Sequence, residues 1–449
     1  MKIHDKLDWK GIIMEKKYKM ALSYSRKDSK IEKILEEELE KVFTGSVFTD
    51  MLRSEELANA TRLKEKLQSV FLDAEYSIIL YSKNYYEGNF TLTELEAILS
   101  CVELGKEPHF FIIKINDEQK LPDKLNGRTY IDLKVPESFK EDFENPQSKK
   151  CMEDLENVTN QIHGFIHEQI KKFMIVQTIK EKSGKEFSLN IHTTFASGNE
   201  AKWRMDYDWN LLGTAYMEEK SRQIKKNTTW KDFWMYLEQD FLWIKKNLQS
   251  KPELLLKIHF NCHLSIAYKL GSIYGDLGQA SGNRNLVLMS SNRVSGCVFP
   301  LEKEVHYTKT EDFCKEYEGN CNKSTDIVCI ISIKPRKEEK IVKTVKEFLY
   351  EQSVNCCKIY LFQKEMGIEN INALESMAEY LHKKMKNCRT GSKCKIHLFP
   401  DTTAPLMFVL GAKTIFPGEI QLYEYNQQQD TYTMSLKRYG DNCDGKRPL

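Results

Sequence analysis

The residues best suited to catalysis lie just after a predicted strand in the first half of the chain. A short apolar run is followed by Ser82 and Tyr85, and the next predicted helix opens with Phe90 and Glu94. A carboxylate fixed beside a reacting sugar can stabilise a developing positive charge. An acidic residue in a first helical turn is also a common structural choice, because the helix dipole favours it. Glu94 is therefore the first candidate for catalysis, whereas Glu96 points elsewhere on the same helix.

Two earlier strands of this half also end in polar side chains. Tyr24, Ser25 and Arg26 follow the first strand, and Asp50 follows the second. With the residues after the third strand they form an ordered set. No GxxxxGK[ST] phosphate loop, no GxGxxG after a strand and no GxSxG elbow occurs in the sequence. Standard kinase, NTPase, dehydrogenase and hydrolase sites therefore lose their main support.

Apolar runs and helical spacing predict the elements that position this set. Short apolar runs predict strands, and apolar residues at every third or fourth position predict helices. The strands are expected at residues 19–25, 46–49, 76–81 and 109–115, and the helices at 29–42, 57–71 and 93–104. Alternating elements of these lengths predict an α/β fold with a parallel sheet covered on both faces.

The order and spacing of the polar set resemble the TIR domain family over residues 16–150. The most recognisable piece is Ser82, Tyr85, Phe90 and Glu94, although the aromatic is more often Trp in that family. The resemblance implies a flavodoxin-like fold. For the enzymatic members it also implies cleavage of the bond between nicotinamide and ribose in NAD⁺, with Glu94 in the place of their essential carboxylate.

Cleavage of NAD⁺ suits a carboxylate at this position. Nicotinamide is a cationic leaving group, and its loss leaves an oxocarbenium-like ribose that a carboxylate can stabilise. Aromatic side chains of the set are expected to pack against the rings, and its hydroxyls and arginine to bind hydroxyls or phosphate. The predicted substrate-binding residues are Tyr24, Ser25, Arg26, Asp50, Ser82 and Phe90.

A long helical stretch separates the two halves. Its apolar stripe consists of Leu155, Val158, Ile162, Phe165 and Ile170. Residues 151–184 are expected to close the first domain, to connect it to the second, or both. His163 and His167 have the i and i+4 spacing of metal ligands, but HGFIH lacks the glutamate of catalytic HExxH sites. We expect a histidine pair on the polar face of the helix.

Two segments of the second half resemble each other. Lys-Ile-His-Phe at 257–260 opens one, and Lys-Ile-His-Leu at 395–398 opens the other. Gly271 and Gly411, each after a leucine, are expected to close the helices that follow. Further strands are expected at residues 286–290, 326–333, 358–362 and 419–425. Two facing Rossmann-like halves account for this pattern best, with chance similarity of common strand-helix units as the alternative.

The segment from residue 395 to 438 has a specific order of elements. It reads as a strand, a turn with proline, a helix, a strand ending in Leu-Tyr-Glu-Tyr and a final strand with tyrosine. This order resembles the SAVED domain family, over residues 185–449. The resemblance implies two fused CARF-like Rossmann halves that bind a cyclic oligonucleotide, and we expect cyclic triadenylate as the activator.

A ligand of such halves is expected in the crevice at the carboxyl ends of the parallel strands. The candidates just past strands are His263, Ser265, Lys334, Arg336, Asp401, Thr402 and Thr403. Thr402 or Thr403 can cap its helix and leave backbone N–H groups facing a phosphate. The alternative is that these residues are ordinary helix caps and solvated loop charges.

Bulk properties limit the other functions. A chain of 449 residues predicts two to three domains, and its 67 basic against 65 acidic residues favour neither membranes nor long nucleic acids as partners. No apolar stretch approaches the ~18–20 residues of a membrane span, and the first ten residues do not resemble a signal peptide. The 12 cysteines lack CxxC pairs. We therefore expect reduced thiols in the cytoplasm, no metal and no cofactor.

Together the two resemblances imply a TIR-SAVED effector of bacterial cyclic-oligonucleotide (CBASS) defence against phage. The sensor would bind the signal, and the TIR domain would then deplete NAD⁺. Because TIR domains act in assemblies, activation is expected to produce homo-oligomers or open filaments. Two other classes stay open, a non-enzymatic TIR scaffold and a different nucleotide hydrolase under the same sensor.

Overall fold

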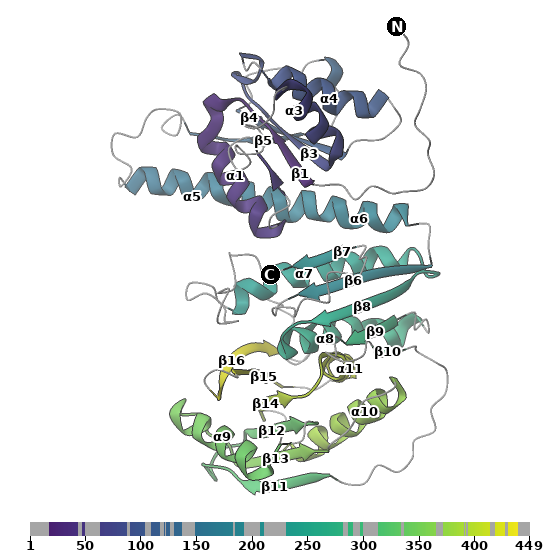
Figure 1. The fold of residues 1–449 in the computed structure, drawn as a ribbon. Coiled ribbons are helices and arrows are strands. Elements are labelled where there is room, and N and C mark those ends of the chain that lie inside the picture. The colour runs from purple at the N-terminus through teal and green to yellow at the C-terminus, as the bar shows by residue number, and fades with distance from the viewer. Residues whose placement is uncertain are drawn as a thin grey trace. The chain divides into compact units, whose positions relative to one another are not determined.

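The computed structural model divides the chain into two compact units, Met1–Lys171 and Lys172–Leu449 (Figure 1). The structure describes residues 18–43, 47–49, 63–87, 90–103, 109–116, 121, 123–125, 130–136, 149–182, 185–192, 207–210, 230–281, 286–290, 297–299, 313–333, 336–364, 371–389, 391, 394–413, 418–426 and 430–438. Each unit has its own sheet or sheets and its own hydrophobic core.

The first unit is built on one five-stranded sheet in the order β2-β1-β3-β4-β5, with all neighbours parallel. The strands are β1 Tyr18–Ser23, β2 Val47–Phe48, β3 Ala74–Tyr81, β4 His109–Ile115 and β5 Tyr130–Leu133. The central strand β3 is buried along almost its whole length. Such a continuous apolar strand is typical of a parallel sheet with both faces covered.

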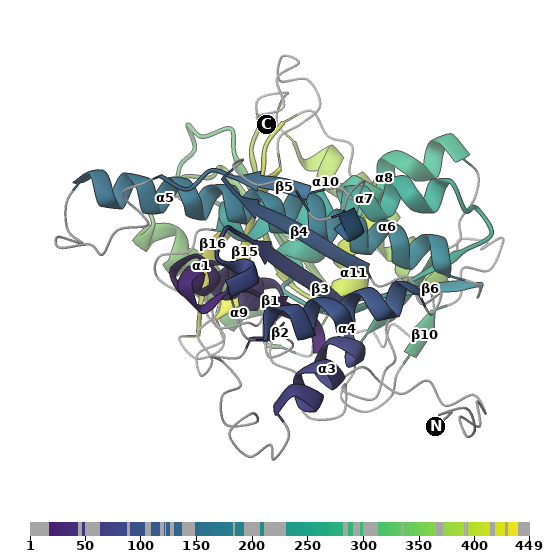
Figure 2. The same ribbon diagram turned by 90° about the horizontal axis from the view of Figure 1, so that it is seen from above.

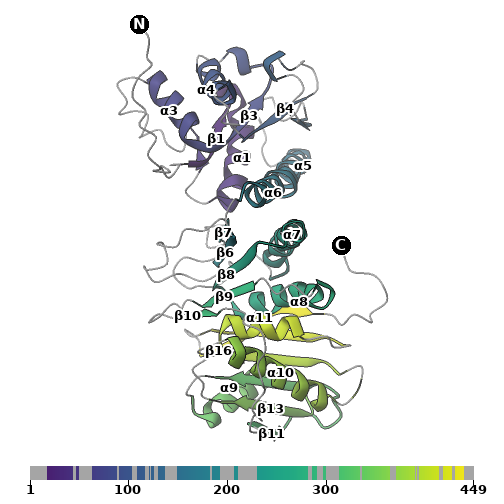
Figure 3. The same cartoon turned by 90° about the vertical axis from the view of Figure 1, so that its right-hand side faces the viewer.

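Helices cover both faces of this sheet. Two of them, α3 (Leu63–Asp73) and α4 (Thr91–Glu103), pack together on one face (Figure 2). On the other face lie α1 (Ser29–Val42) and α5 (Lys149–Gly164) (Figure 3). Short 3₁₀ turns follow three strands, η1 Arg26–Asp28, η2 Tyr85–Glu87 and η3 Asp123–Leu125. The predicted α/β fold of the first half is thereby confirmed.

The predicted long helical stretch is confirmed, but it is not uniformly α-helical. After α5 comes a π-helical segment, η5 (Phe165–Ile170), and then α6 (Lys171–Glu181). The rings of His163 and His167 are tilted by 34° with centroids 4.3 Å apart, and His163 Nδ1 lies 2.9 Å from Oε2 of the buried Glu38 on α1. The prediction of a polar-face pair is wrong. His167, in η5, is buried, and His163 is half-buried because α5 packs against α1.

The first sheet of the second unit has the order β10-β9-β8-β6-β7, and only the β9–β10 pair is antiparallel. Its strands are β6 Glu186–His192, β7 Tyr207–Asn210, β8 Leu255–Asn261, β9 Leu286–Ser290 and β10 Cys297–Phe299. Two helices accompany it, α7 Trp230–Gln249 and α8 Leu264–Ser281. Apolar side chains of β6, β8 and both helices share one buried core.

The second sheet of this unit has the order β11-β13-β12-β14-β15-β16, with antiparallel pairs only at its two edges. Its strands are β11 Cys314–Glu318, β12 Ile327–Ser332, β13 Lys358–Gln363, β14 Ile396–Asp401, β15 Ile420–Asn426 and β16 Thr431–Arg438. Its helices are α9 Glu338–Glu351, α10 Ile371–Cys388 and α11 Ala404–Lys413. The prediction of two Rossmann-like halves is confirmed.

The corresponding helices of the two halves, α8 and α11, pack against each other at a pair of glycines. A Cβ on Gly271 would lie 1.8 Å from the backbone oxygen of Phe408, and one on Gly411 would lie 2.0 Å from the backbone oxygen of Tyr268. The prediction that these glycines end their helices is wrong, because both helices continue beyond them. Glycine is required here by the close approach of two backbones.

In the part of the chain that the structure describes, no helix is long and apolar enough to cross a membrane. The same residues contain no group of three or more His, Cys, Asp or Glu side chains that could hold a metal ion. Described cysteines such as Cys329 and Cys394 are free thiols buried in the core.

Candidate functional site

Glu94 lies in the first turn of α4, beside the carboxyl end of β1. Its backbone N–H donates to the Phe90 carbonyl at 3.0 Å. Its side chain is buried, and Oε2 accepts a 2.7 Å hydrogen bond from Oγ of Ser23, the last residue of β1. Glu96, on the same helix, is exposed. The helix start and the strand end together hold the Glu94 carboxylate in one position.

The Ser23 hydroxyl also lies 2.7 Å from the phenolic oxygen of Tyr85, in the turn after β3. Tyr85 is fully buried, and burial raises the pKa of its phenol far above the ordinary value, so the phenol keeps its proton. Ser23 has one proton and gives it to Glu94, so Tyr85 must donate to Ser23. The Thr91 hydroxyl donates to the Tyr85 carbonyl at 2.5 Å and ties this turn to α4. Side chains from β1, η2 and α4 therefore form one chain of hydrogen bonds.

A second buried carboxylate, Asp28, joins the residues after β1 to those after β3. Ser82 Oγ donates to its Oδ2 at 2.5 Å, and Asn84 Nδ2 donates to its Oδ1 at 3.0 Å. Burial raises the pKa of the Asp28 carboxyl, and these two hydrogen bonds offset part of the rise. Ser82, which was predicted to bind substrate, thus donates its hydroxyl proton to Asp28.

The other predicted substrate-binding residues lie beside the same strand end and helix start. Tyr24 and Ser25 follow β1 and are buried, whereas Arg26 is exposed. Phe90 is 38% exposed just before α4, so part of its ring is open to a ligand. Asp50 lies outside the described residues.

The sequence predictions missed two members of this site, Ser23 and Asp28, and gave Tyr85 no partner. A signal for Ser23 was present, because it is a polar residue at the end of an apolar strand. Which of Ser23 and Ser25 reaches the carboxylate depends on where the strand ends and how it pairs. The sequence does not specify that register.

In the second unit, three neighbouring strands carry polar residues in register at their carboxyl ends. These are Gln363 of β13, Ser332 of β12 and Asp401 of β14. Arg336 Nε lies 3.1 Å from Oδ2 of the buried Asp401, and its guanidinium stacks 4.5 Å from the ring centroid of Tyr425. The predicted Arg336 and Asp401 therefore meet, as an ion pair.

The start of α11 lies at the same strand ends. Thr403 caps the helix, since its carbonyl accepts from the Met407 N–H at 3.1 Å. The neighbouring Thr402 is buried, and its Oγ1 has no hydrogen-bond partner among the described residues; the same holds for the Ser332 hydroxyl. Buried hydroxyls of this kind are left for a ligand or water to satisfy. The predicted Lys334 lies outside the described residues.

The start of α8, in the other half, is arranged differently. The His263 carbonyl accepts from the Ala267 N–H at 3.2 Å, and the His263 ring packs edge-on against Trp230 at 5.2 Å. Burial lowers the pKa of His263 to about 4, so the ring is neutral near pH 7 and offers no positive charge to a phosphate. Ser265 is fully buried, and its backbone N–H donates to Oε1 of Glu424 at 2.6 Å.

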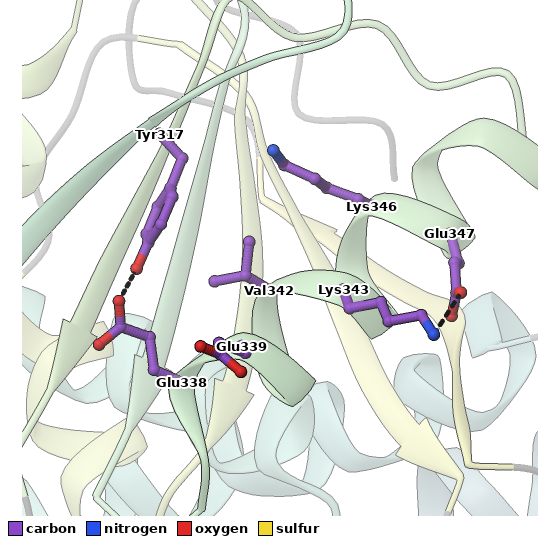
Figure 4. Close-up of a pocket in the computed structure, with 7 residues that line it drawn as sticks. All are labelled: Tyr317, Glu338, Glu339, Val342, Lys343, Lys346 and Glu347. Carbon is purple, nitrogen blue, oxygen red and sulfur yellow. Dashed lines mark hydrogen bonds and ion pairs between the residues drawn. The ribbon is translucent and has the colours of Figure 1, made fainter.

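Two cavities in the described region are lined by none of the predicted site residues. One, of about 360 Å³, lies between β11 and α9 (Figure 4). Among its lining residues, Tyr317 donates to Glu338, and Lys343 Nζ lies 3.7 Å from Oε1 of Glu347. The other, of about 260 Å³, lies between β5 and the α5–η5 helix.

Comparison with protein families assigns a domain to each unit. A model of the TIR domain matches residues 20–145, which include Ser23 and Glu94. A model of SAVED, the SMODS-associated and fused to various effectors sensor domain, matches residues 243–437. The chain joins a TIR domain to a SAVED domain. In this TIR-SAVED chain, the strand ends with Arg336 and Asp401 therefore belong to the sensor.

Several solved structures are similar to the TIR-SAVED chain. The Acinetobacter baumannii Cap4 SAVED/CARF-domain containing receptor with the cyclic trinucleotide 3'3'3'-cAAA is 15% identical, with 86% of this chain and 84% of that chain covered and a TM-score of 0.39. The Moraxella osloensis Cap4 receptor is 13% identical, with 86% and 84% covered and a TM-score of 0.37. A metazoan TIR-STING receptor from C. gigas in complex with 2',3'-cGAMP is 11% identical, with 54% and 91% covered and a TM-score of 0.20. No curated protein matches the chain.

Proposed function

We propose that this chain is an NAD⁺-cleaving effector that a cyclic oligonucleotide activates. The TIR domain hydrolyses NAD⁺ to ADP-ribose and nicotinamide, and the SAVED domain is the switch. The observation that supports the enzymatic part is the buried carboxylate of Glu94, fixed by Ser23 at the start of α4. In a bacterial cell, NAD⁺ depletion would stop phage growth.

The main requirement of the proposed reaction is a fixed negative charge beside the ribose. A strong acid or base is less important. The bond between ribose C1′ and the nicotinamide nitrogen breaks, and its electron pair leaves with nicotinamide as a neutral base. The ribose becomes oxocarbenium-like, and Glu94 stabilises the positive charge there. Water then adds to C1′ and releases one proton. Because Ser23 already orients the carboxylate, little reorganisation is required in the transition state.

For the sensor we propose a cyclic oligoadenylate, specifically cyclic triadenylate, bound at the carboxyl ends of the strands. The start of α11 supplies backbone N–H groups, and the buried hydroxyls of Ser332 and Thr402 lie beside it. Helix starts and arginine are both suited to phosphate, and Arg336 lies over the face of Tyr425 at this edge. Ligand binding is proposed to drive homo-oligomers or filaments, which light scattering would detect as a rise in mass.

The decisive experiment incubates the purified full chain with NAD⁺ and a panel of cyclic di-, tri- and tetra-nucleotides. We expect nicotinamide release only with the matching activator, rising faster than linearly with protein concentration. NAD⁺ left intact under every condition would instead favour a non-enzymatic TIR scaffold. Products other than nicotinamide and ADP-ribose would favour a different nucleotide hydrolase under the same sensor.

A further inference from the structure

The two Rossmann-like halves of the SAVED domain are joined by a carboxylate that crosses between them. Glu424 lies on β15 of the second half, and its Oε1 accepts the 2.6 Å hydrogen bond from the backbone N–H of Ser265 on α8 of the first half. Glu424 is only 9% exposed, and Ser265 is fully buried. A carboxyl group of the protein itself thus occupies the positive end of the α8 dipole.

The surroundings of this carboxylate compensate its charge only in part. Burial raises the pKa of Glu424 to about 7, although the Ser265 side chain and the backbone N–H groups of Ser265 and Leu264 favour the charged form. Among the described residues, the Cys262 thiol before α8 and the Tyr432 phenol on β16 interact with it, and burial raises the pKa of both, so they remain neutral. The Glu424 carboxyl at the start of α8 therefore changes between its neutral and charged forms near pH 7.

The matching helix start in the other half is not closed in this way. In the second half, the strand next to β14 is β15, which carries Glu424. The corresponding strand in the first half is β9, next to β8, and its sequence LVLMS contains no carboxylate that could close the start of α11. At α11, the buried hydroxyl of Thr402 instead has no partner among the described residues. Two helices that correspond in the fold thus differ in what their starts offer to an anion.

We propose that the Glu424 carboxyl group closes the α8 helix start, so that the ligand's phosphate contact falls on the α11 start beside Thr402. This inference rests on the proposed sensor function and adds to it that the two halves bind the ligand unequally. It also predicts that the ionised Glu424 opposes binding, because it places a negative charge in the domain that receives phosphates.

The first test needs no ligand. Glu424→Gln keeps an oxygen that accepts from the Ser265 N–H but removes the charge. We expect the full-length variant to melt above the wild type at pH 8, with the difference closing as the pH falls toward 4.5. The matched control is Glu419→Gln, just before β15, whose carboxylate lies 2.7 Å from Lys395 Nζ and should lose stability at pH 8 instead. A Glu424→Gln protein that melts at or below the wild type at pH 8 would overturn the inference.

The second test measures the affinity for cyclic triadenylate by calorimetry at pH 6 and pH 8. We expect Glu424→Gln to bind about two- to five-fold more tightly than the wild type at pH 8, in line with a charge at a helix end, and equally at pH 6. Thr402→Val should weaken binding at both pH values. A folded Glu424→Gln protein that has lost binding would show that Glu424 contacts the ligand and would overturn the inference. If the wild type binds no cyclic oligonucleotide, the proposed function fails, while the melting comparison still decides the role of Glu424.

Discussion

Two buried carboxylates, one in each domain, are held by different kinds of donor. Glu94 of the TIR domain takes its hydrogen bond from the hydroxyl of Ser23, and Glu424 of the SAVED domain takes one from the backbone N–H of Ser265. A hydroxyl can donate and accept at once, so Ser23 links the Glu94 carboxylate to the Tyr85 phenol. A backbone N–H only donates and so favours the charged form, but burial outweighs this contact and raises the pKa of Glu424 to about 7. The first arrangement suits a reacting group and the second an architectural one.

The largest expected effect is on catalytic activity, which should depend on Glu94. Glu94→Gln should lower nicotinamide release about 10²–10³-fold, as for other groups that stabilise charge in a transition state. Glutamine keeps the size of the side chain, so the free energy of unfolding should change by about 2 kcal/mol at most, the upper range for a partly buried charge at a helix start. Turnover is measured at saturating activator, with melting and ligand affinity on the same preparation.

Glu96→Gln is the matched control, because Glu96 is exposed on the same helix. It should retain most activity. Near-normal turnover of the Glu94 variant, or a loss confined to the Glu96 variant, would contradict the assignment.

The second effect concerns stability and pH in the SAVED domain. The pKa of Glu424 is about 7 in the folded protein against an ordinary 4.5, so the folded state binds more protons between these values. Stability from this group is therefore present below about pH 4.5 and is lost as the pH rises through about 7. The loss amounts to about 3 kcal/mol at most. Denaturant titrations of wild type and Glu424→Gln at pH 5, 6, 7 and 8 measure it, and parallel pH profiles would contradict it.

A smaller effect tests the hydroxyl that holds Glu94. Ser23→Ala should lower kcat about tenfold with little change in KM, the expected cost of one hydrogen bond to a charged group. Because the Tyr85 phenol and the Glu94 carboxylate both bond to the Ser23 hydroxyl, Tyr85→Phe should add little once Ser23 is alanine. Ser100→Ala, which removes a hydroxyl bonded within α4 itself, is the control. Full activity of the Ser23 variant would show that the carboxylate needs no positioning.

The smallest effect on stability is expected at an exposed carboxylate, Glu87. Glu87 pairs with Lys27 at 2.5 Å at the surface of the TIR domain, and this contact lowers the pKa of its carboxyl. Surface ion pairs contribute little to stability. Glu87→Gln should therefore leave the melting temperature unchanged at pH 7, as calorimetry would show. A clear drop would mean that burial is not what distinguishes Glu94 and Glu424.

The TIR site was largely predictable because its signals are local. The residues from Ser82 to Glu94 lie within one turn and one helix start, so their spacing in the sequence already places them together. Strands such as β3 and β4 were found from their apolar runs, whereas β5 was missed, since it is a short edge strand with exposed residues. Local pattern thus identified the catalytic candidate and the main layers.

The SAVED site was less predictable because its contacts join distant segments. Nothing near Glu424 in the sequence indicates that it reaches Ser265, which is 159 positions away. Gly271 and Gly411 were interpreted as helix ends, the commonest role of glycine in helices. Their actual role depends on two helices meeting, which neither helix encodes alone.

The reciprocal glycine contact has a consequence for the ancestry and the engineering of such sensors. Since each glycine makes room for the backbone of the other helix, the two halves can be recombined with foreign halves only when the incoming half brings its own glycine. A hybrid that carries alanine at either position would fail at assembly, however well its ligand edge was built. For α8 and α11 to pack in this way, both Gly271 and Gly411 must therefore remain glycine.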